Sequence, residues 1–147
     1  MARVGLLEDN MRIAKLCVTM LNHAGHDVVL YIDASECLQS LAVLDLLTLP
    51  SVLAKGTDEL SPLPIDVLIL DLHLPTMPGL DVLRYLRSHP RTCALPLIFC
   101  TAAPTSEINV ALNIAPDAAL VEKPFKLQTL VNAITESLAP EGEHQPS

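Results

Sequence analysis

Short, nearly continuous apolar runs alternate along the chain with stretches in which apolar residues recur at helical spacing. The apolar runs span residues 3–8, 27–32, 65–71, 95–101 and 117–122. Apolar residues recur at positions i, i+3, i+4 and i+7 within 14–21, 34–41, 108–115 and 127–134, and 79–89 is a less regular fifth case. Because the first pattern is typical of buried strands and the second of amphipathic helices, we expect five strands alternating with five helices.

This alternation indicates successive βαβ units, in which the strands pair in parallel. Strands that are apolar on both sides, joined by right-handed crossovers, place helices on both faces of the sheet. The prolines agree with this division: Pro78, Pro104 and Pro124, for example, fall between the expected elements, where they break no helix. The expected fold class is therefore α/β, with a doubly wound parallel sheet.

The length favours a single domain, because 147 residues are enough to bury a substantial core. We expect residues 1–139 to form this domain and the polar residues 140–147 to form a disordered tail. The segment at about 50–64 contains glycine and several prolines and matches neither pattern. We interpret it as a long loop insertion.

Charge and cysteine content narrow the function classes. A net charge of −8 disfavours nucleic-acid binding by this domain, since an acidic surface repels phosphates. The chain has neither an uncharged apolar run of membrane-spanning length nor a signal-peptide core, so we expect a cytoplasmic protein without a membrane partner. Cys17, Cys37, Cys93 and Cys100 lie far apart, which favours reduced, mostly buried thiols over a disulfide framework or a zinc site.

The ends of the expected strands carry the candidate chemistry. Glu8 and Asp9 end the first strand or follow it, Asp71 ends the third, Thr101 ends the fourth and Lys123 follows the fifth. In open α/β sheets, binding sites form outside the carboxyl ends of the strands. Three carboxylates in one crevice repel one another unless their pKa values rise or a cation binds, and such oxygen ligands suit Mg²⁺.

These residue types together point to phosphoryl chemistry. Asp71 is the only carboxylate that the central strand presents, and aspartate is a known covalent phosphoryl acceptor. Thr101 can offer a hydroxyl to a phosphoryl oxygen, and Lys123 can offer a positive charge. Structural roles are open to the same residues. Asp9 is also a good N-cap for the helix that follows, Asp71 could cap a turn, and Lys123 could be a solvated lysine.

In four motifs the chain resembles the receiver domains of two-component response regulators. The motifs are "LLEDN" with Glu8 and Asp9, "LILDLHLPTMPGLDVL" with Asp71, "FCTA" with Thr101 and "EKPF" with Lys123. The resemblance covers residues 3 to about 138. It implies a flavodoxin-like (βα)5 fold, with a parallel five-stranded sheet in the order 2-1-3-4-5.

The resemblance also implies roles for individual residues. Asp71 would accept a phosphoryl group from the phosphohistidine of a histidine kinase or a histidine phosphotransfer protein. The metal Mg²⁺ would be held by Glu8, Asp9, Asp71 and the backbone carbonyl of His73. Thr101 would sense the phosphoryl group and Lys123 would pair with it. In this family the peptide bond that precedes the residue matching Pro124 is typically cis.

Such a domain would be a signalling switch and not a conventional enzyme. It would catalyse its own Mg²⁺-dependent phosphorylation and dephosphorylation on Asp71, and phosphorylation would alter a surface within residues 105–138. That surface could contact a downstream protein target, an output domain or a second copy of the chain.

Two alternative functions remain beside this one. Leu120 stands where the family usually has an aromatic residue that reports phosphorylation, which leaves the output mechanism open and is compatible with a pseudo-receiver that is never phosphorylated. A Mg²⁺-dependent phosphohydrolase of the haloacid dehalogenase kind also uses an aspartate at a strand end. That family needs a second acid two residues later, and this chain has His73 there, which argues against it.

Overall fold

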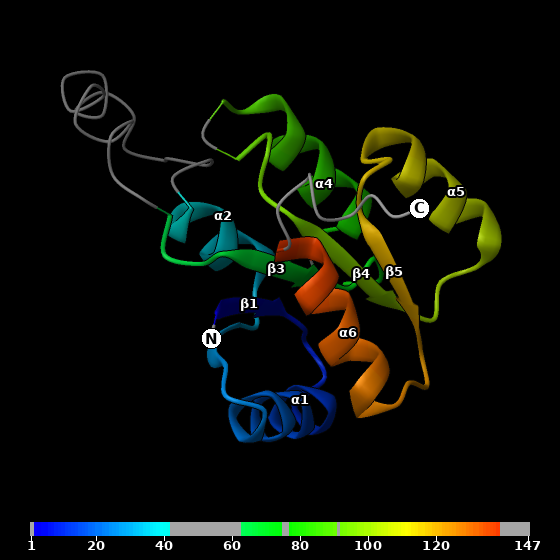
Figure 1. Ribbon diagram of the computed structural model, residues 1–147. Coiled ribbons are helices and arrows are strands. Elements are labelled where there is room, and N and C mark those ends of the chain that lie inside the picture. The colour runs from blue at the N-terminus through cyan, green and yellow to red at the C-terminus, as the bar shows by residue number, and fades with distance from the viewer. Residues whose placement is uncertain (1, 42–62, 75–76, 91, 139–147) are drawn as a thin grey trace, which may run out of the picture.

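The computed structural model describes residues 2–41, 63–74, 77–90 and 92–138, in which strands and helices alternate as the sequence pattern predicts (Figure 1). The strands are β1 (Arg3–Leu7), β2 (Asp27–Tyr31), β3 (Val67–Leu70), β4 (Leu97–Thr101) and β5 (Ala119–Glu122). The helices are α1 (Met11–His23), α2 (Ala34–Ser40), α4 (Gly79–Ser88), α5 (Thr105–Ile114) and α6 (Leu127–Leu138). The expected insertion at 50–64, apart from its last two residues, and the expected tail at 140–147 lie outside the described residues.

The five strands form one parallel sheet in the order β2-β1-β3-β4-β5. This confirms the expected doubly wound α/β fold and its strand order. The strand β3 lies at the centre of the sheet and is buried along its whole length, as its apolar sequence predicts. Since the strands are parallel, all five carboxyl ends lie at the same edge of the sheet.

Two hydrophobic cores lie on opposite faces of the sheet. Successive strand residues alternate between them: Leu68 and Leu70 belong to one core, and Val67 and Ile69 to the other. Helices α2, α4 and α5 cover the first face, whereas α1 and α6 cover the second (Figure 1). Both faces are thus buried, which explains why the central strands are continuous apolar runs and show no alternation with polar residues.

The helix that follows β1 begins one residue later than the N-cap role considered for Asp9 would require. The N-cap of α1 is Asn10, whose Oδ1 accepts hydrogen bonds from the backbone N–H groups of Arg12 at 3.0 Å and Ile13 at 3.3 Å. Asparagine and aspartate are about equally good N-caps, so the local sequence alone did not decide between them. The carboxylate of Asp9 is therefore not used by the helix cap.

The cysteines agree with the prediction of reduced, mostly buried thiols. Cys17, Cys37 and Cys100 are buried and Cys93 is exposed, and all four are free. Burial, the largest cause, raises the pKa of Cys37 to about 12, so this thiol stays protonated at neutral pH. Among the described residues, no helix is both long enough and apolar enough to cross a membrane.

Candidate functional site

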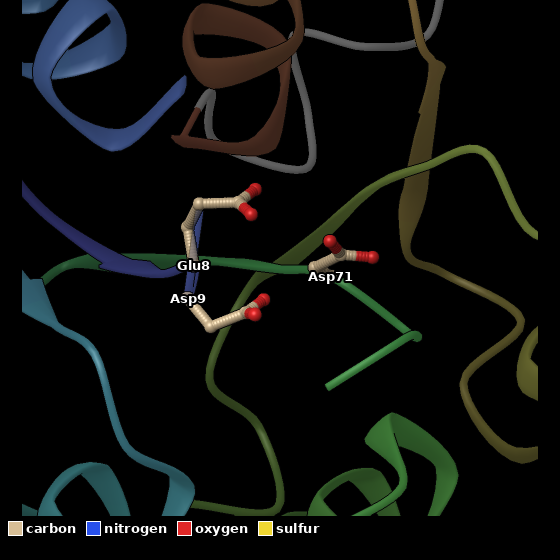
Figure 2. A group of neighbouring side chains, drawn as sticks. All are labelled: Glu8, Asp9 and Asp71. Carbon is tan, nitrogen blue, oxygen red and sulfur yellow. The ribbon is translucent and has the colours of Figure 1, made fainter. Parts of the chain in front are cut away.

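Three carboxylates converge at the carboxyl edge of the sheet. Glu8 and Asp9 directly follow β1, and Asp71 directly follows β3, the neighbouring strand. One oxygen from each carboxylate lies within 4.8 Å of one from each of the others. Figure 2 shows the side chains of Glu8 and Asp9 extending from the end of β1 toward the side on which Asp71 follows β3. The three residues therefore lie close together, as the sequence predicts.

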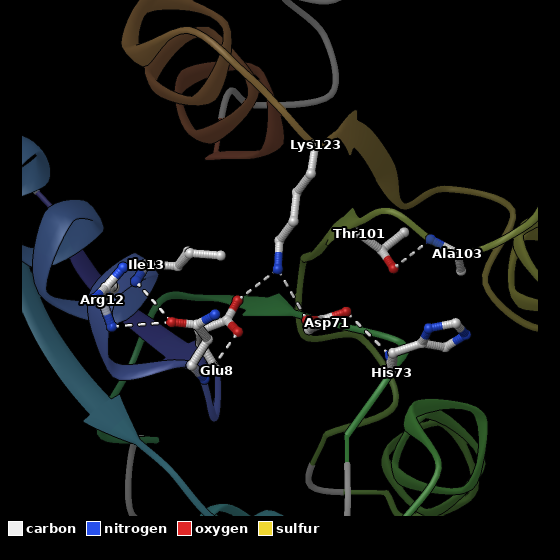
Figure 3. Close-up of polar contacts among 9 residues, drawn as sticks. Glu8, Arg12, Ile13, Asp71, His73, Thr101, Ala103 and Lys123 are labelled. Carbon is white, nitrogen blue, oxygen red and sulfur yellow. Dashed lines mark hydrogen bonds and ion pairs between the residues drawn. The ribbon is translucent and has the colours of Figure 1, made fainter.

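The lysine after β5 connects two of these carboxylates. Its Nζ donates hydrogen bonds to Glu8 Oε1 at 2.9 Å and to Asp71 Oδ2 at 3.0 Å (Figure 3). Glu8 and Asp71 are almost fully buried, with 3% and 6% of their surface exposed. Buried carboxylates require such partners, because desolvation of an unpaired charge is costly. Lys123 is therefore part of the site and not a solvated lysine.

The electrostatics of Lys123 reflect this position. Burial, the largest single effect, lowers the pKa of the ammonium group. The hydrogen bonds and negative charges of Glu8 and Asp71 act in the opposite direction and prevail, so that the pKa of Lys123 is raised. One ammonium group against three carboxylates leaves a formal charge of −2 (1 − 3), which a divalent cation would neutralise.

The second oxygen of Asp71 is held by the main chain. The backbone N–H of His73 donates to Asp71 Oδ1 at 3.0 Å. The His73 ring points away from the carboxylates (Figure 3) and its Nε2 lies 2.6 Å from Glu107 Oε1. The main chain of His73, and not its ring, thus adjoins the acid cluster, and the metal-ligand role expected for its backbone carbonyl stays a prediction.

The segment that carries Asp71 is packed tightly against the start of α4. The N–H of Gly79 donates to the carbonyl of Leu72 at 2.9 Å. A Cβ atom at position 79 would lie 2.7 Å from the carbonyl oxygens of both Asp71 and Leu72, which is too close for any side chain. Glycine at this position thus permits the close approach that fixes the backbone behind the carboxylate.

Thr101 ends β4 beside Asp71, because β4 is the other neighbour of β3 (Figure 3). Its side chain is fully buried, and its Oγ1 accepts a hydrogen bond from the N–H of Ala103 at 3.1 Å. Since a hydroxyl both accepts and donates, the proton of Thr101 is available for an acceptor oxygen at the site. The peptide bond between Lys123 and Pro124 is cis, as the family resemblance implies.

Two contributors were not singled out from the sequence. The N–H of Asn10 donates to Glu8 Oε2 at 3.2 Å and so orients that carboxylate. The Asp-Asn pair before a helical pattern is the signal that could have identified this residue, because the N–H groups around a helix N-cap are available to acids. Glu107, the partner of His73, had no local signal, since 34 residues separate the two.

The departure at position 120 is visible at the surface. Leu120 is 37% exposed on β5, an edge strand of the sheet. An aliphatic side chain offers no hydrogen bond to a neighbour. Any change at Thr101 therefore has no hydroxyl-bearing ring at this position to act on.

Comparison with known proteins identifies the family. A family model of the response regulator receiver domain matches residues 4–135, so the chain belongs to the response regulator receiver domain family. The DNA-binding response regulator MtrA of Mycolicibacterium smegmatis is 29% identical over 137 residues, which cover 92% of this chain and 50% of that protein. The chain thus spans about half the length of the curated relative.

Solved structures support the same fold. A CheY-like response regulator receiver domain protein from Methanospirillum hungatei superimposes with a TM-score of 0.72 at 20% identity, covering 99% of each chain. The receiver domain of a sensor histidine kinase from Pseudomonas aeruginosa has a TM-score of 0.71 at 21% identity, covering 93% of this chain and 97% of that one. In that structure a magnesium ion is coordinated in the active site cleft.

Proposed function

We propose that this receiver domain accepts a phosphoryl group on Asp71 from a phosphohistidine of a histidine kinase or a histidine phosphotransfer protein. The observation that carries the proposal is that the Asp71 carboxylate is buried and hydrogen-bonded to Lys123. This carboxylate is buried at the end of the central strand, lies within an acid cluster and is bonded through Oδ2 to Lys123. A rigidly held nucleophile beside a fixed positive charge is what phosphoryl transfer requires.

The transfer step balances without a further reactant. An oxygen of the Asp71 carboxylate forms a bond to phosphorus while the bond from phosphorus to the imidazole nitrogen of the donor breaks. The departing nitrogen takes up a proton, and the phosphoryl group becomes an acyl phosphate on Asp71. The switch is reset by hydrolysis: the oxygen of water forms a bond to phosphorus, the bond from phosphorus to the Asp71 oxygen breaks, and inorganic phosphate is released from the restored carboxylate.

Thr101 and Lys123 would stabilise the charge that the phosphoryl oxygens carry. Lys123 already contacts the acceptor carboxylate at 3.0 Å, and a phosphoryl group on Asp71 would lie within reach of the same ammonium group. The hydroxyl of Thr101, at the end of the neighbouring strand, can donate to another phosphoryl oxygen. Neither residue needs to change its place in the fold for this role.

The donor set also suits Mg²⁺. Three hard carboxylate oxygens within 4.8 Å of one another and a formal charge of −2 after Lys123 is counted match a divalent cation that binds few protein ligands. Glu8, Asp9, Asp71 and the backbone carbonyl of His73 would hold it. When bound, the cation would neutralise charge on the carboxylates and on the phosphoryl oxygens. The magnesium ion in the receiver domain from P. aeruginosa supports this assignment.

The partners follow from the same chemistry. A kinase or phosphotransfer protein must bring its phosphohistidine to the carboxyl edge of the sheet. A downstream protein, an output domain or a second copy of the chain would read the surface formed by residues 105–138. The acidic charge of −8 argues against nucleic-acid binding by this domain itself, and we place the protein in the cytoplasm, where histidine kinases present their phosphohistidines.

The proposal is tested by the intact mass of the protein after incubation with Mg²⁺ and a small acyl-phosphate donor. We expect the wild type to gain one phosphoryl group and Asp71→Asn to gain none. Because asparagine has nearly the same shape as aspartate, loss of labelling in this variant would not be due to lost packing. A folded wild type that gains no mass would refute the proposal and favour the pseudo-receiver, whereas release of phosphate from phosphomonoesters would favour the phosphohydrolase.

A further inference from the structure

The His73 ring and Glu107 join the acceptor segment to a helix that is distant in sequence. The Nε2–H group of the ring donates to Glu107 Oε1 at 2.6 Å, and 34 residues separate the partners. An ionised carboxylate has only acceptors, so the ring nitrogen must carry the proton. A hydrogen bond to a charged acceptor at this distance is of the stronger kind.

Each end of this contact is anchored in a different part of the molecule. His73 is bonded to the acceptor, because its N–H donates to Asp71 Oδ1 at 3.0 Å (Figure 3). Glu107 lies in the first turn of α5, where its N–H and that of Ile108 donate to the carbonyl of Pro104. Ile108 is buried in the core below. The chain Asp71–His73–Glu107 therefore runs from the acceptor carboxylate to a helix that packs on the sheet.

This connection matters because the expected reporter is absent from position 120. The side chain of Leu120 cannot form a hydrogen bond, so a change at Thr101 has no polar side chain at this position on which to act. The contact between His73 and Glu107 offers a direct route from the acceptor to the surface of α5. It requires no rotation of a ring on β5.

We propose that Glu107 is a positioning residue that ties the acceptor segment to α5, so that phosphorylation of Asp71 changes the conformation of the first turn of that helix. The inference rests on the proposed phosphorylation of Asp71. A phosphoryl group on one oxygen of Asp71 alters the bond that the other oxygen accepts from the His73 N–H. The ring moves with its backbone, and Glu107 follows the ring.

The coupling is reciprocal and modest. If phosphorylation weakens or strengthens the contact, the contact alters the stability of the phosphorylated state by the same factor. The side chains of His73 and Glu107 are 57% and 40% exposed. Exposed pairs of this kind contribute little, so we expect a change in the steady-state level of phosphorylation of at most about fivefold when the pair is removed.

The experiment compares the wild type with Glu107→Ala, Glu107→Gln and the control Glu136→Ala, which removes an exposed glutamate on α6. Each protein is held at steady state with Mg²⁺ and excess acyl phosphate, and its labelling is measured by intact mass. The backbone amide chemical shifts of residues 105–108 are recorded with and without the donor. We expect all four proteins to be labelled, the shifts of residues 105–108 to respond in the wild type and in Glu136→Ala, and the response to be lost in Glu107→Ala.

The conservative variant separates positioning from mere helix stability. Glu107→Gln keeps an acceptor oxygen for the ring and should retain most of the response, although it has lost the charge. Equal responses in the wild type and in labelled Glu107→Ala would overturn the inference while leaving the proposed function intact. No labelling of the wild type would overturn both, and labelling of the wild type with no response in residues 105–108 would overturn the inference alone.

Discussion

Two partly buried cationic side chains lie at opposite ends of the strands, and their surroundings differ. Lys123, at the carboxyl edge, donates to two carboxylates, Glu8 and Asp71. Arg87, at the amino edge, donates through Nη1 to the backbone carbonyls of Leu95 at 3.0 Å and Thr92 at 3.3 Å. Its Nη2 lies 3.6 Å from a carboxylate oxygen of Asp117, a side chain that is largely exposed.

The difference indicates that Lys123 belongs to a functional site, whereas Arg87 is a structural clamp, a side chain that holds two segments of the backbone together. At the amino edge, one guanidinium donates to two neutral carbonyls, lies 3.6 Å from the carboxylate of Asp117 and joins the end of α4 to the segment before β4. At the carboxyl edge, negative charge exceeds positive charge even after Lys123 is counted. A fold does not need such an excess for its stability. Among the residues that the structure describes, Glu8, Asp9 and Asp71 form the one group of three acids close enough to hold a metal ion, which indicates that the carboxyl edge is built to take up a cation and an anionic group.

The largest difference between the two cations should appear in the rate of phosphorylation when each is replaced by alanine. Lys123→Ala should slow labelling by acyl phosphate about 100-fold, the cost of losing one preorganised donor at a reacting centre. Arg87→Ala should be labelled at the rate of the wild type. The measurement is the initial rate of mass gain, with circular dichroism to verify that each variant is folded.

Lys123→Arg serves as a second variant for this prediction, since it keeps the charge and changes the geometry. We expect it to recover only part of the rate, because the larger planar guanidinium directs its donors differently from the compact ammonium group. Normal labelling of Lys123→Ala would remove the role assigned to the lysine and, with it, the contrast between the two edges.

The reverse contrast should appear in stability. Arg87→Ala removes two hydrogen bonds to backbone carbonyls and should lower the free energy of unfolding by about 2–3 kcal/mol. The matched control is Arg84→Ala in the same helix. The Nη1 atom of Arg84 lies 3.3 Å from the exposed carboxylate of Asp81, so this substitution should lower the free energy of unfolding by no more than about 0.5 kcal/mol. Urea denaturation measures both values. Equal losses in the two variants would show that Arg87 is not a clamp.

The sequence predicted which residues lie at the carboxyl edge but not how they pair. Glu8, Asp71 and Lys123 each follow an apolar strand, and a parallel sheet gathers such positions automatically. That one ammonium group bonds both carboxylates depends on contacts across 115 and 52 residues, which no local pattern encodes.

Other features show the same limit. The contact of His73 with Glu107 and the clamp at Arg87 depend on how loops and helices pack, so periodicity could not reveal them. The helix cap shows a different limit: Asp9 and Asn10 are equally suitable by local rules, and the gathering of Asp9 into the acid cluster leaves Asn10 as the cap. Local sequence preferences thus predict that a helix begins near residue 10, but contacts with the rest of the fold determine which residue is its N-cap.

Cation binding provides the next prediction, because the three acids at the carboxyl edge leave a formal charge of −2 after Lys123 is counted. Mg²⁺ at ten times its dissociation constant should raise the free energy of unfolding by about 1.4 kcal/mol, by binding the folded state alone. Asp9→Asn should abolish most of this increase. The control Asp27→Asn changes an exposed acid at the start of β2 and should keep it. The melting temperature, recorded with and without Mg²⁺, tests the prediction, and a melting curve unchanged by Mg²⁺ in the wild type would count against the metal site.

The smallest effect is expected in alkaline solution, where the two cations again differ. The pKa of Lys123 is raised above the usual 10.5 because its bonds to Glu8 and Asp71 outweigh its burial. The folded state therefore binds this proton more tightly than the unfolded state. Its contribution to stability is fully present below pH 10.5 and is lost as the pH rises through the higher pKa of the folded state.

The stability difference between the wild type and Lys123→Ala should thus be constant up to about pH 10 and shrink above it. Burial raises the pKa of Cys17 to about 11 and that of Cys100 to about 12, so both proteins lose stability from about pH 9 upward, and only the difference between them reports on the lysine. The difference between the wild type and Arg87→Ala should stay level over the same range, because a guanidinium does not lose its proton there. A difference for Lys123→Ala that is equally level would mean that the ammonium group and the two carboxylates are not coupled in solution.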